Sequence, residues 1–114
     1  MALVLSSNEI PETVVSDLAI RRTITGENLM LTRYEAKAGA EFEGHSHPEE
    51  QVGYVIKGRV EFFIGEPEVR YEFTAGTFFR FEPNERHRSR ALEDIVVVDI
   101  FSPPRPEYVA EAKR

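Results

Sequence analysis

The sequence predicts an all-β domain built from short antiparallel strands, of the sandwich, jelly-roll or barrel type. β-branched and aromatic residues fall into short runs, Gly, Pro and Asn separate these runs at close intervals, and helical periodicity is hard to find. Roughly nine such runs favour a sheet that closes on itself, because closure hides the hydrogen-bonding edges of a sheet.

The predicted strands are, in chain order, 19–25, 29–36, 40–43, 51–57, 59–64, 69–73, 77–81, 87–91 and 95–101. Turn-forming residues such as Gly65, Gly76 and Asn84 lie between them. The proline-rich stretch 102–106 ends the last strand, because proline cannot donate to a strand ladder. We expect residues 107–113 to form one or two helical turns, which gives the β domain a short C-terminal helical tail.

Length and charge limit the classes of protein to which the chain can belong. With 114 residues, 41% hydrophobic and 30% charged, the chain suits one globular domain rather than two. Fourteen Lys and Arg stand against twenty Asp and Glu, which gives a net charge of −6. Nucleic acid is therefore not an expected partner, because its binding relies on clustered positive charge.

The chain contains no cysteine, so any metal ion must be held by nitrogen and oxygen ligands. Residues 1–12 lack the basic start and the apolar stretch of a secretory signal. The longest apolar run elsewhere, 95–98, is far shorter than the roughly 20 residues of a membrane-spanning helix. We therefore expect a soluble, cytoplasmic protein with no membrane partner.

The three histidines are candidate metal ligands. His45 and His47 are two residues apart, so in one strand their side chains point to the same face, and Gln51 joins them if the strand continues past Pro48. His87 begins a later predicted strand. Imidazole suits divalent first-row metals, and a Gln oxygen would complete a set of three nitrogens and one oxygen. The alternative is a polar loop whose histidines are solvated.

Asp99 interrupts the most apolar run of the chain, 95–101, and shares a strand face with Ile95, Val97 and Phe101. A carboxylate on an apolar face has two interpretations. It accepts hydrogen bonds at a strand end, or burial raises its pKa into the range that is useful for acid–base catalysis beside a metal.

A family resemblance favours the metal-binding interpretation. One stretch of the chain reads Gly39-x5-His45-x-His47-x3-Gln51-x6-Gly58. It resembles the first motif of the cupin superfamily, and Gly76 and His87 are spaced like the Gly and His of the second. The resemblance covers about residues 29–101, and it implies that residues 1–114 form a single-domain cupin jelly-roll β-barrel. It also implies that the three histidines hold a metal ion near the open end of that barrel.

Gln51 stands where most cupins have a glutamate ligand. A neutral ligand leaves the charge of the metal uncompensated, which favours an anionic substrate and Lewis-acid chemistry. The sequence leaves the identity of the single divalent ion open among Mn, Fe, Co, Ni, Cu and Zn.

A closer resemblance concerns the runs 45–51 and 99–105, which look like those of KdgF, a family of small cupins from pectin and alginate breakdown. That family converts cyclic 4,5-unsaturated monouronates into linear keto-uronates. The resemblance implies a metal site of three histidines and one glutamine. It also implies catalytic roles for Asp99, Phe101 and Arg105, which match an Asp-x-Phe-x3-Arg pattern.

Two other functions remain open, a metal-dependent cupin dioxygenase and a non-enzymatic sugar-binding or sensory cupin. The neutral Gln51 favours the enzyme for a small anionic sugar over the dioxygenase. We expect a homodimer, because the last strand is apolar on both faces. Tyr34, Tyr54, Phe78 and Arg80 also lie in predicted strands, but the sequence does not define which of them point inward.

Overall fold

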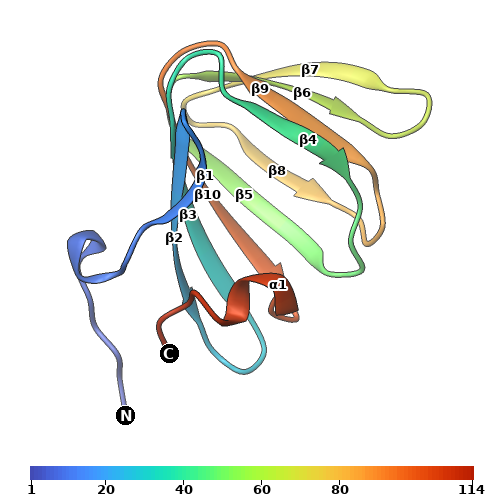
Figure 1. The fold of residues 1–114 in the computed structure, drawn as a ribbon. Coiled ribbons are helices and arrows are strands. Elements are labelled where there is room, and N and C mark those ends of the chain that lie inside the picture. Colours follow the sequence, from blue (N-terminus) through green and yellow to red (C-terminus); the bar gives the residue numbers. More distant parts are fainter.

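The computed structural model describes residues 1–114 and contains ten β-strands with one short helix at each end (Figure 1). The elements are η1 (Ser7–Glu9), β1 (Thr13–Ser16), β2 (Ala19–Thr25), β3 (Met30–Ala36), β4 (Glu41–His45), β5 (Glu50–Lys57), β6 (Arg59–Ile64), β7 (Val69–Thr74), β8 (Phe78–Phe81), β9 (His87–Ala91), β10 (Ile95–Ser102) and α1 (Pro106–Val109). The prediction of an all-β protein with a short helical tail is confirmed.

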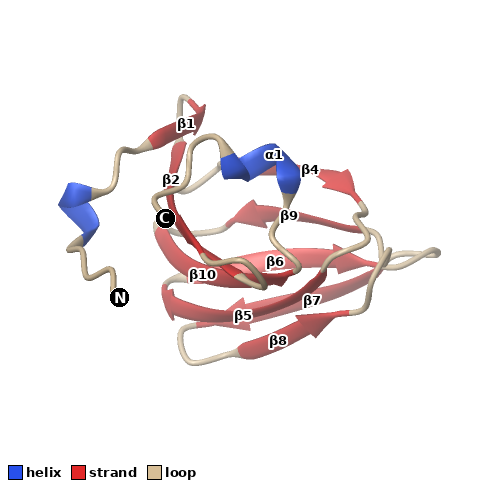
Figure 2. Ribbon diagram, turned by 90° about the horizontal axis from the view of Figure 1, so that it is seen from below, coloured by secondary structure: helices blue, strands red, loops and turns tan.

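The strands form two antiparallel sheets that face each other as in a jelly roll (Figures 1 and 2). The six-stranded sheet has the order β1-β2-β3-β10-β5-β8, and the four-stranded sheet has the order β4-β9-β6-β7. The sheets lie close together at one end and diverge at the other, where α1 lies (Figure 1). The interior therefore has a closed end and an open end.

The predicted strands agree with the observed ones within two residues at each boundary, and β2, β6 and β9 have the predicted limits. Strand β1 was not predicted. It has four residues and pairs with β2 alone, so it depends on a neighbouring strand rather than on a long β-forming run of its own.

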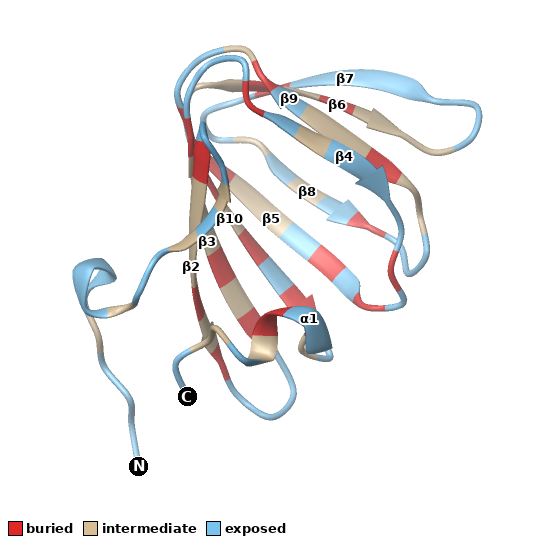
Figure 3. Cartoon of the chain, in the orientation of Figure 1, coloured by how far each residue is buried: buried red, intermediate tan, exposed pale blue.

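Strand β10 lies at the centre of the larger sheet, between β3 and β5, and its side chains alternate between two faces (Figure 3). Ile95, Val97, Asp99 and Phe101 are buried toward the interior, and the residues between them are more exposed. The face predicted for Asp99 is therefore confirmed.

Aromatic rings from β6, β7 and β8 fill part of the interior. We call the four residues Phe62, Phe73, Phe79 and Phe81 the phenylalanine cluster. Their ring centroids lie 4.9 to 5.5 Å apart, which is the range of favourable aromatic contact. Phe62, Phe73 and Phe81 belong to a core of eleven buried apolar residues that joins the two sheets, and the partly buried Phe79 packs against this core.

The C-terminal tail returns to the larger sheet after α1. The Lys113 backbone donates to the Thr23 carbonyl at 3.0 Å, and the Lys113 carbonyl accepts from the Thr25 N–H at 2.8 Å. Arg21 on β2 also donates two hydrogen bonds to the Glu111 carboxylate. These contacts fix α1 beside the open end of the interior.

None of the helices has both the length and the apolar composition needed to cross a bilayer. The cytoplasmic location stays a prediction from the sequence.

Candidate metal centre

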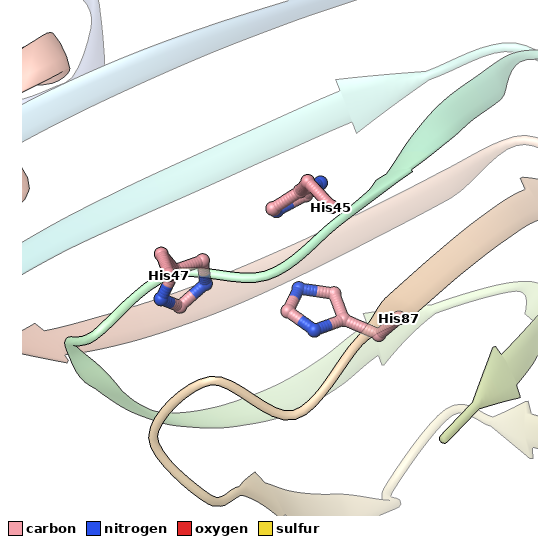
Figure 4. A group of neighbouring side chains, drawn as sticks. All are labelled: His45, His47 and His87. Atoms are coloured by element: carbon pink, nitrogen blue, oxygen red, sulfur yellow. The ribbon is translucent and has the colours of Figure 1, made fainter. Parts of the chain in front are cut away.

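Three histidines converge where the two sheets diverge (Figure 4). His45 ends β4 and pairs in register with His87, which begins β9, and His47 lies in the loop after β4. Their ring centroids lie 4.5 to 5.4 Å apart, and one nitrogen from each ring lies within 4.8 Å of the others. We call these three residues the histidine cluster.

Hydrogen bonds to the backbone set the tautomer of every ring in the histidine cluster. Each Nδ1 lies 3.0 Å from a backbone oxygen two positions away, which belongs to Glu43 for His45, to Glu49 for His47 and to Glu85 for His87. A carbonyl oxygen can only accept, so each Nδ1 carries the hydrogen and each Nε2 presents a lone pair. Metal-binding histidines have this arrangement.

A turn holds the two histidine-bearing segments together. Asn84 adopts a left-handed backbone conformation with φ of 65°, which Asn tolerates better than most residues. Its N–H donates to the His47 carbonyl at 2.7 Å. The loop that leads into β9 therefore fixes the loop that carries His47.

Gln51 completes the donor set from β5. Its side chain is buried, and its Oε1 lies 3.1 Å from the Nε2 of His47. The condition that one strand continues past Pro48 is not met, because β4 ends at His45 and β5 begins at Glu50. Proline has no N–H for the strand ladder, so the chain bends there and Gln51 reaches the cluster from the next strand.

Burial favours the neutral form of two members of the histidine cluster, His45 and His87. It lowers the pKa of His87 to about 4, although the hydrogen bond to the Glu85 carbonyl favours the charged form. Burial also lowers the pKa of His45. Neutral imidazole is the form that binds a metal.

A divalent transition metal fits this donor set. Three imidazole nitrogens and one amide oxygen are suitable ligands for several first-row ions, and a set of four leaves positions for substrate on ions that accept more ligands. All four side chains are neutral, so an ion held here would keep its full positive charge. The geometry does not select one metal.

Asp99 lies beside this donor set on β10. Its side chain is buried, and its Oδ1 has no hydrogen-bond partner. Burial raises the pKa of Asp99 to about 7, although Gln51 and the positive charge of Arg105 favour the carboxylate. The strand-end interpretation predicts a hydrogen bond at this oxygen, and the structure contains none.

Gly53 makes the space that the Asp99 carboxylate occupies. The two residues are paired across β5 and β10. A Cβ at position 53 would lie 2.6 Å from Asp99 Oδ1 and 2.2 Å from the Phe79 ring. Any side chain at this position would therefore displace the carboxylate or the phenylalanine cluster.

Phe101 and Arg105 border the same site. The Phe101 ring stands edge-on to His47 with centroids 5.6 Å apart. The Arg105 guanidinium is buried, donates to the Tyr108 hydroxyl at 2.8 Å and to the Glu107 carboxylate at 2.9 Å, and leaves its Nε–H without a partner. Arg105 is therefore an ordered part of the interior rather than a solvated residue of the tail.

A small open cavity of about 60 Å³ joins these groups. Six of the seven site residues that the sequence pointed to line it: His45, Gln51, His87, Asp99, Phe101 and Arg105. His47 lies behind them, against Phe101 and Gln51. Tyr34 also lines the cavity, whereas Tyr54 and Phe78 contact each other, with ring centroids 4.5 Å apart, away from it.

Comparison with known proteins agrees with this architecture. The cupin domain family matches residues 32–101, so the chain belongs to the cupin family. No curated protein sequence matches the chain.

Similar solved structures include KdgF from Halomonas sp., with 25% identity and a TM-score of 0.86 over 96% of this chain and 100% of that one. A RmlC-like cupin from Shewanella frigidimarina has 24% identity and a TM-score of 0.87, over 96% and 97% of the two chains. Oxalate decarboxylase from Bacillus subtilis shares the fold, with 23% identity and a TM-score of 0.78, but the match covers 28% of that longer chain.

Proposed function

We propose that this protein is a metal-dependent enzyme that converts a cyclic 4,5-unsaturated monouronate into its linear keto form. One observation carries the proposal. Three kinds of unsatisfied group line or border a single cavity, namely the lone pairs of the histidine cluster, Oδ1 of Asp99 and the Nε–H of Arg105. The full-length likeness to KdgF and the family resemblance of the sequence support the choice of substrate.

The proposed reaction is an isomerisation that needs no second reactant. The bond between C1 and the ring oxygen breaks, and the C1 hydroxyl becomes an aldehyde as it loses its proton. The ring oxygen becomes the C5 ketone, and C4 gains one proton as the double bond disappears. A single group that takes the first proton and returns the second is therefore sufficient.

Asp99 is suited to carry this proton. Its Oδ1 has no partner within the protein, so a substrate hydroxyl can occupy that position. The carboxyl is buried, which protects the transferred proton from exchange with water.

Arg105 and Phe101 orient the sugar in this proposal. Arg105 presents an unpaired Nε–H to an anionic group, and its two terminal nitrogens are already held by Tyr108 and Glu107. The Phe101 ring forms an apolar wall next to His47. The divalent metal, when bound, supplies Lewis-acid polarisation of a substrate oxygen.

The test follows the ultraviolet absorbance of the conjugated double bond in an unsaturated galacturonate or mannuronate. Metal-loaded protein should accelerate its loss over the spontaneous rate, with oxygen excluded and one linear keto-uronate as product. A rate equal to the spontaneous one would refute the proposal. Oxygen consumption would then favour the dioxygenase, and tight sugar binding without turnover would favour the sensory cupin.

We also propose that two copies associate through the outer face of the larger sheet. Val52, Ile56, Phe78 and Ile100 are exposed there on neighbouring strands, and Phe78 is 80% exposed. A contiguous apolar sheet face of this kind is typical of a contact between identical subunits. Light scattering should find a dimer that Phe78→Glu converts to a monomer, and a monomeric parent at micromolar concentration would contradict this.

A further inference from the structure

Tyr34 and Tyr108 form a line of hydrogen bonds with Arg105. Arg105 donates from one terminal nitrogen to the Tyr108 hydroxyl at 2.8 Å, and that hydroxyl lies 3.0 Å from the hydroxyl of Tyr34. Tyr34 lies on β3 and lines the cavity, whereas Tyr108 lies on α1 and is buried outside it. A residue of β3 and two residues of the C-terminal tail thus form one hydrogen-bonded line.

The direction of this line follows from the hydrogens available. A guanidinium has no acceptor, so the Tyr108 oxygen must accept from Arg105. Each tyrosine has one hydroxyl hydrogen, and one of these two hydrogens forms the hydrogen bond between Tyr34 and Tyr108. If Tyr34 donated, the Tyr108 hydrogen would be left buried without a partner. The arrangement that avoids this cost has Tyr108 donate to Tyr34.

The hydroxyl hydrogen of Tyr34 is then free, and Tyr34 borders the cavity. Burial raises the pKa of Tyr34 well above its ordinary value, so the hydroxyl stays protonated at neutral pH. The ring is held edge-on against Phe42, with centroids 5.7 Å apart. Tyr34 therefore offers a fixed donor to an oxygen atom of a bound molecule.

Tyr108 is itself held from two sides. The guanidinium carbons of Arg21 and Arg105 lie 3.9 Å and 4.4 Å from the centre of its ring. Arg21 in turn forms a 2.7 Å ion pair with Glu111, which fixes the segment after α1. The position of Tyr108 is therefore determined by Arg105 at the cavity and by Arg21 outside it.

We propose that Tyr34 is a substrate-binding residue that donates a hydrogen bond to a sugar oxygen, and that Tyr108 is the positioning residue that orients both Tyr34 and Arg105. This inference rests on the proposed function for the class of substrate. It adds a neutral donor on β3 to the charged groups already described. The sugar would thus be held by its carboxylate and by at least one further oxygen.

The test compares Tyr34→Phe, Tyr108→Phe and the double variant in metal-loaded protein. Calorimetry measures the affinity for saturated galacturonate, and the absorbance assay measures KM and kcat for the unsaturated sugar. We expect Tyr34→Phe to weaken galacturonate binding and raise KM about fivefold to tenfold with a smaller change in kcat, as for one lost neutral hydrogen bond.

We expect a larger loss for Tyr108→Phe, because its hydroxyl serves two partners. The double variant should bind no more weakly than Tyr108→Phe alone, since both substitutions break one line of hydrogen bonds. Tyr71→Phe is the matched control, because Tyr71 is exposed on β7 in the other sheet, and it should behave as the parent. Thermal unfolding verifies that each variant is folded.

The outcomes separate this inference from the proposed function. Turnover by the parent with unchanged KM and affinity in Tyr34→Phe would overturn the role of Tyr34 and leave the reaction intact. Additive losses in the double variant would overturn the role of Tyr108 as the residue that orients Tyr34. Galacturonate binding that depends on Tyr34, without turnover by the parent, would support the inference and refute the reaction.

Discussion

The phenylalanine cluster and the histidine cluster are packed at nearly the same spacing, but different interactions stabilise them. Ring centroids are 4.9 to 5.5 Å apart in the first and 4.5 to 5.4 Å apart in the second. Burial and mutual contact are enough to stabilise the phenyl rings. The imidazole rings bring three lone pairs together, which is unfavourable until a cation or protons stand between them.

The two clusters also touch. Phe81 stacks on His87 with centroids 4.3 Å apart and 24° between the ring planes. The phenylalanine cluster therefore supports the position of one candidate ligand. The comparison indicates that the phenylalanine cluster provides stability and that the histidine cluster is built for a ligand that the chain itself does not supply.

The largest expected effect comes from removing ligands. The double variant His45→Ala, His47→Ala should lose its metal completely, whereas purified parent should carry close to one divalent ion per chain. Gln51→Ala and His87→Ala should weaken binding less. Elemental analysis after dialysis measures the metal content. Parent protein without metal even after reconstitution would contradict the assignment.

The next largest effect concerns Asp99, which we expect to move protons without holding the metal. Asp99→Asn should retain the metal and the fold and lose turnover by roughly 10²-fold to 10⁴-fold. Asp17→Asn, in an exposed turn, is the control and should keep full activity. Normal turnover by Asp99→Asn would assign Asp99 a structural role only.

Sequence reasoning located the strands because β-branched runs and turn residues are local signals. It also placed Asp99 on the inward face, because alternation along β10 depends on that strand alone. Strand β1 could not be predicted in this way, since its four residues are held by pairing with β2.

The candidate site was predictable where one short segment or a family spacing defined it, as for the histidine cluster. Gln51 was placed near it by the family spacing, whereas strand parity would have done so only if one strand continued past Pro48. The next strand, β5, brings Gln51 there instead. The burial of Arg105 and the contact between Tyr34 and Tyr108 gave no signal in the sequence. The two tyrosines are 74 residues apart, and the fold of the tail alone brings them together.

Substitutions in the phenylalanine cluster test whether its packing supports metal binding by the histidine cluster. Phe81→Ala and Phe73→Ala should each reduce the free energy of unfolding by roughly 3–5 kcal/mol, because both rings lie in the core. Only Phe81→Ala should also weaken metal binding, by about tenfold, since Phe81 stacks on His87.

Urea unfolding of metal-free protein measures the first effect, and metal titration measures the second. Phe81→Leu provides a milder variant if Phe81→Ala does not fold. Equal metal affinity in the Phe81 and Phe73 variants would show that the two clusters are independent.

The smallest expected effect lies in the tail that supports the open end. Burial raises the pKa of Glu111, but hydrogen bonds from Arg21 and Thr13 and the charge of Arg21 outweigh it, so the net pKa is lowered. The folded state therefore gains stability from this carboxylate above its ordinary pKa near 4.5, and loses it as the pH falls. Glu111→Gln should be less stable than the parent by at most about 1 kcal/mol at pH 7.

At pH 3 this difference should be smaller than at pH 7, because acid protonates the Glu111 carboxylate whereas the Gln side chain has no charge to lose. Urea unfolding at the two pH values measures it. A difference that is the same at both would show that the ion pair with Arg21 does not hold the tail.

The most direct test of the metal centre is a nitrogen NMR spectrum of the three histidine side chains, recorded before and after one equivalent of Zn²⁺, a diamagnetic ion. We predict that every Nε2 resonance shifts to the position of a metal-bound nitrogen while every Nδ1 keeps its hydrogen, as the bonds to the backbone oxygens require. Nε2 resonances that do not respond to Zn²⁺, or binding through Nδ1, would contradict the account.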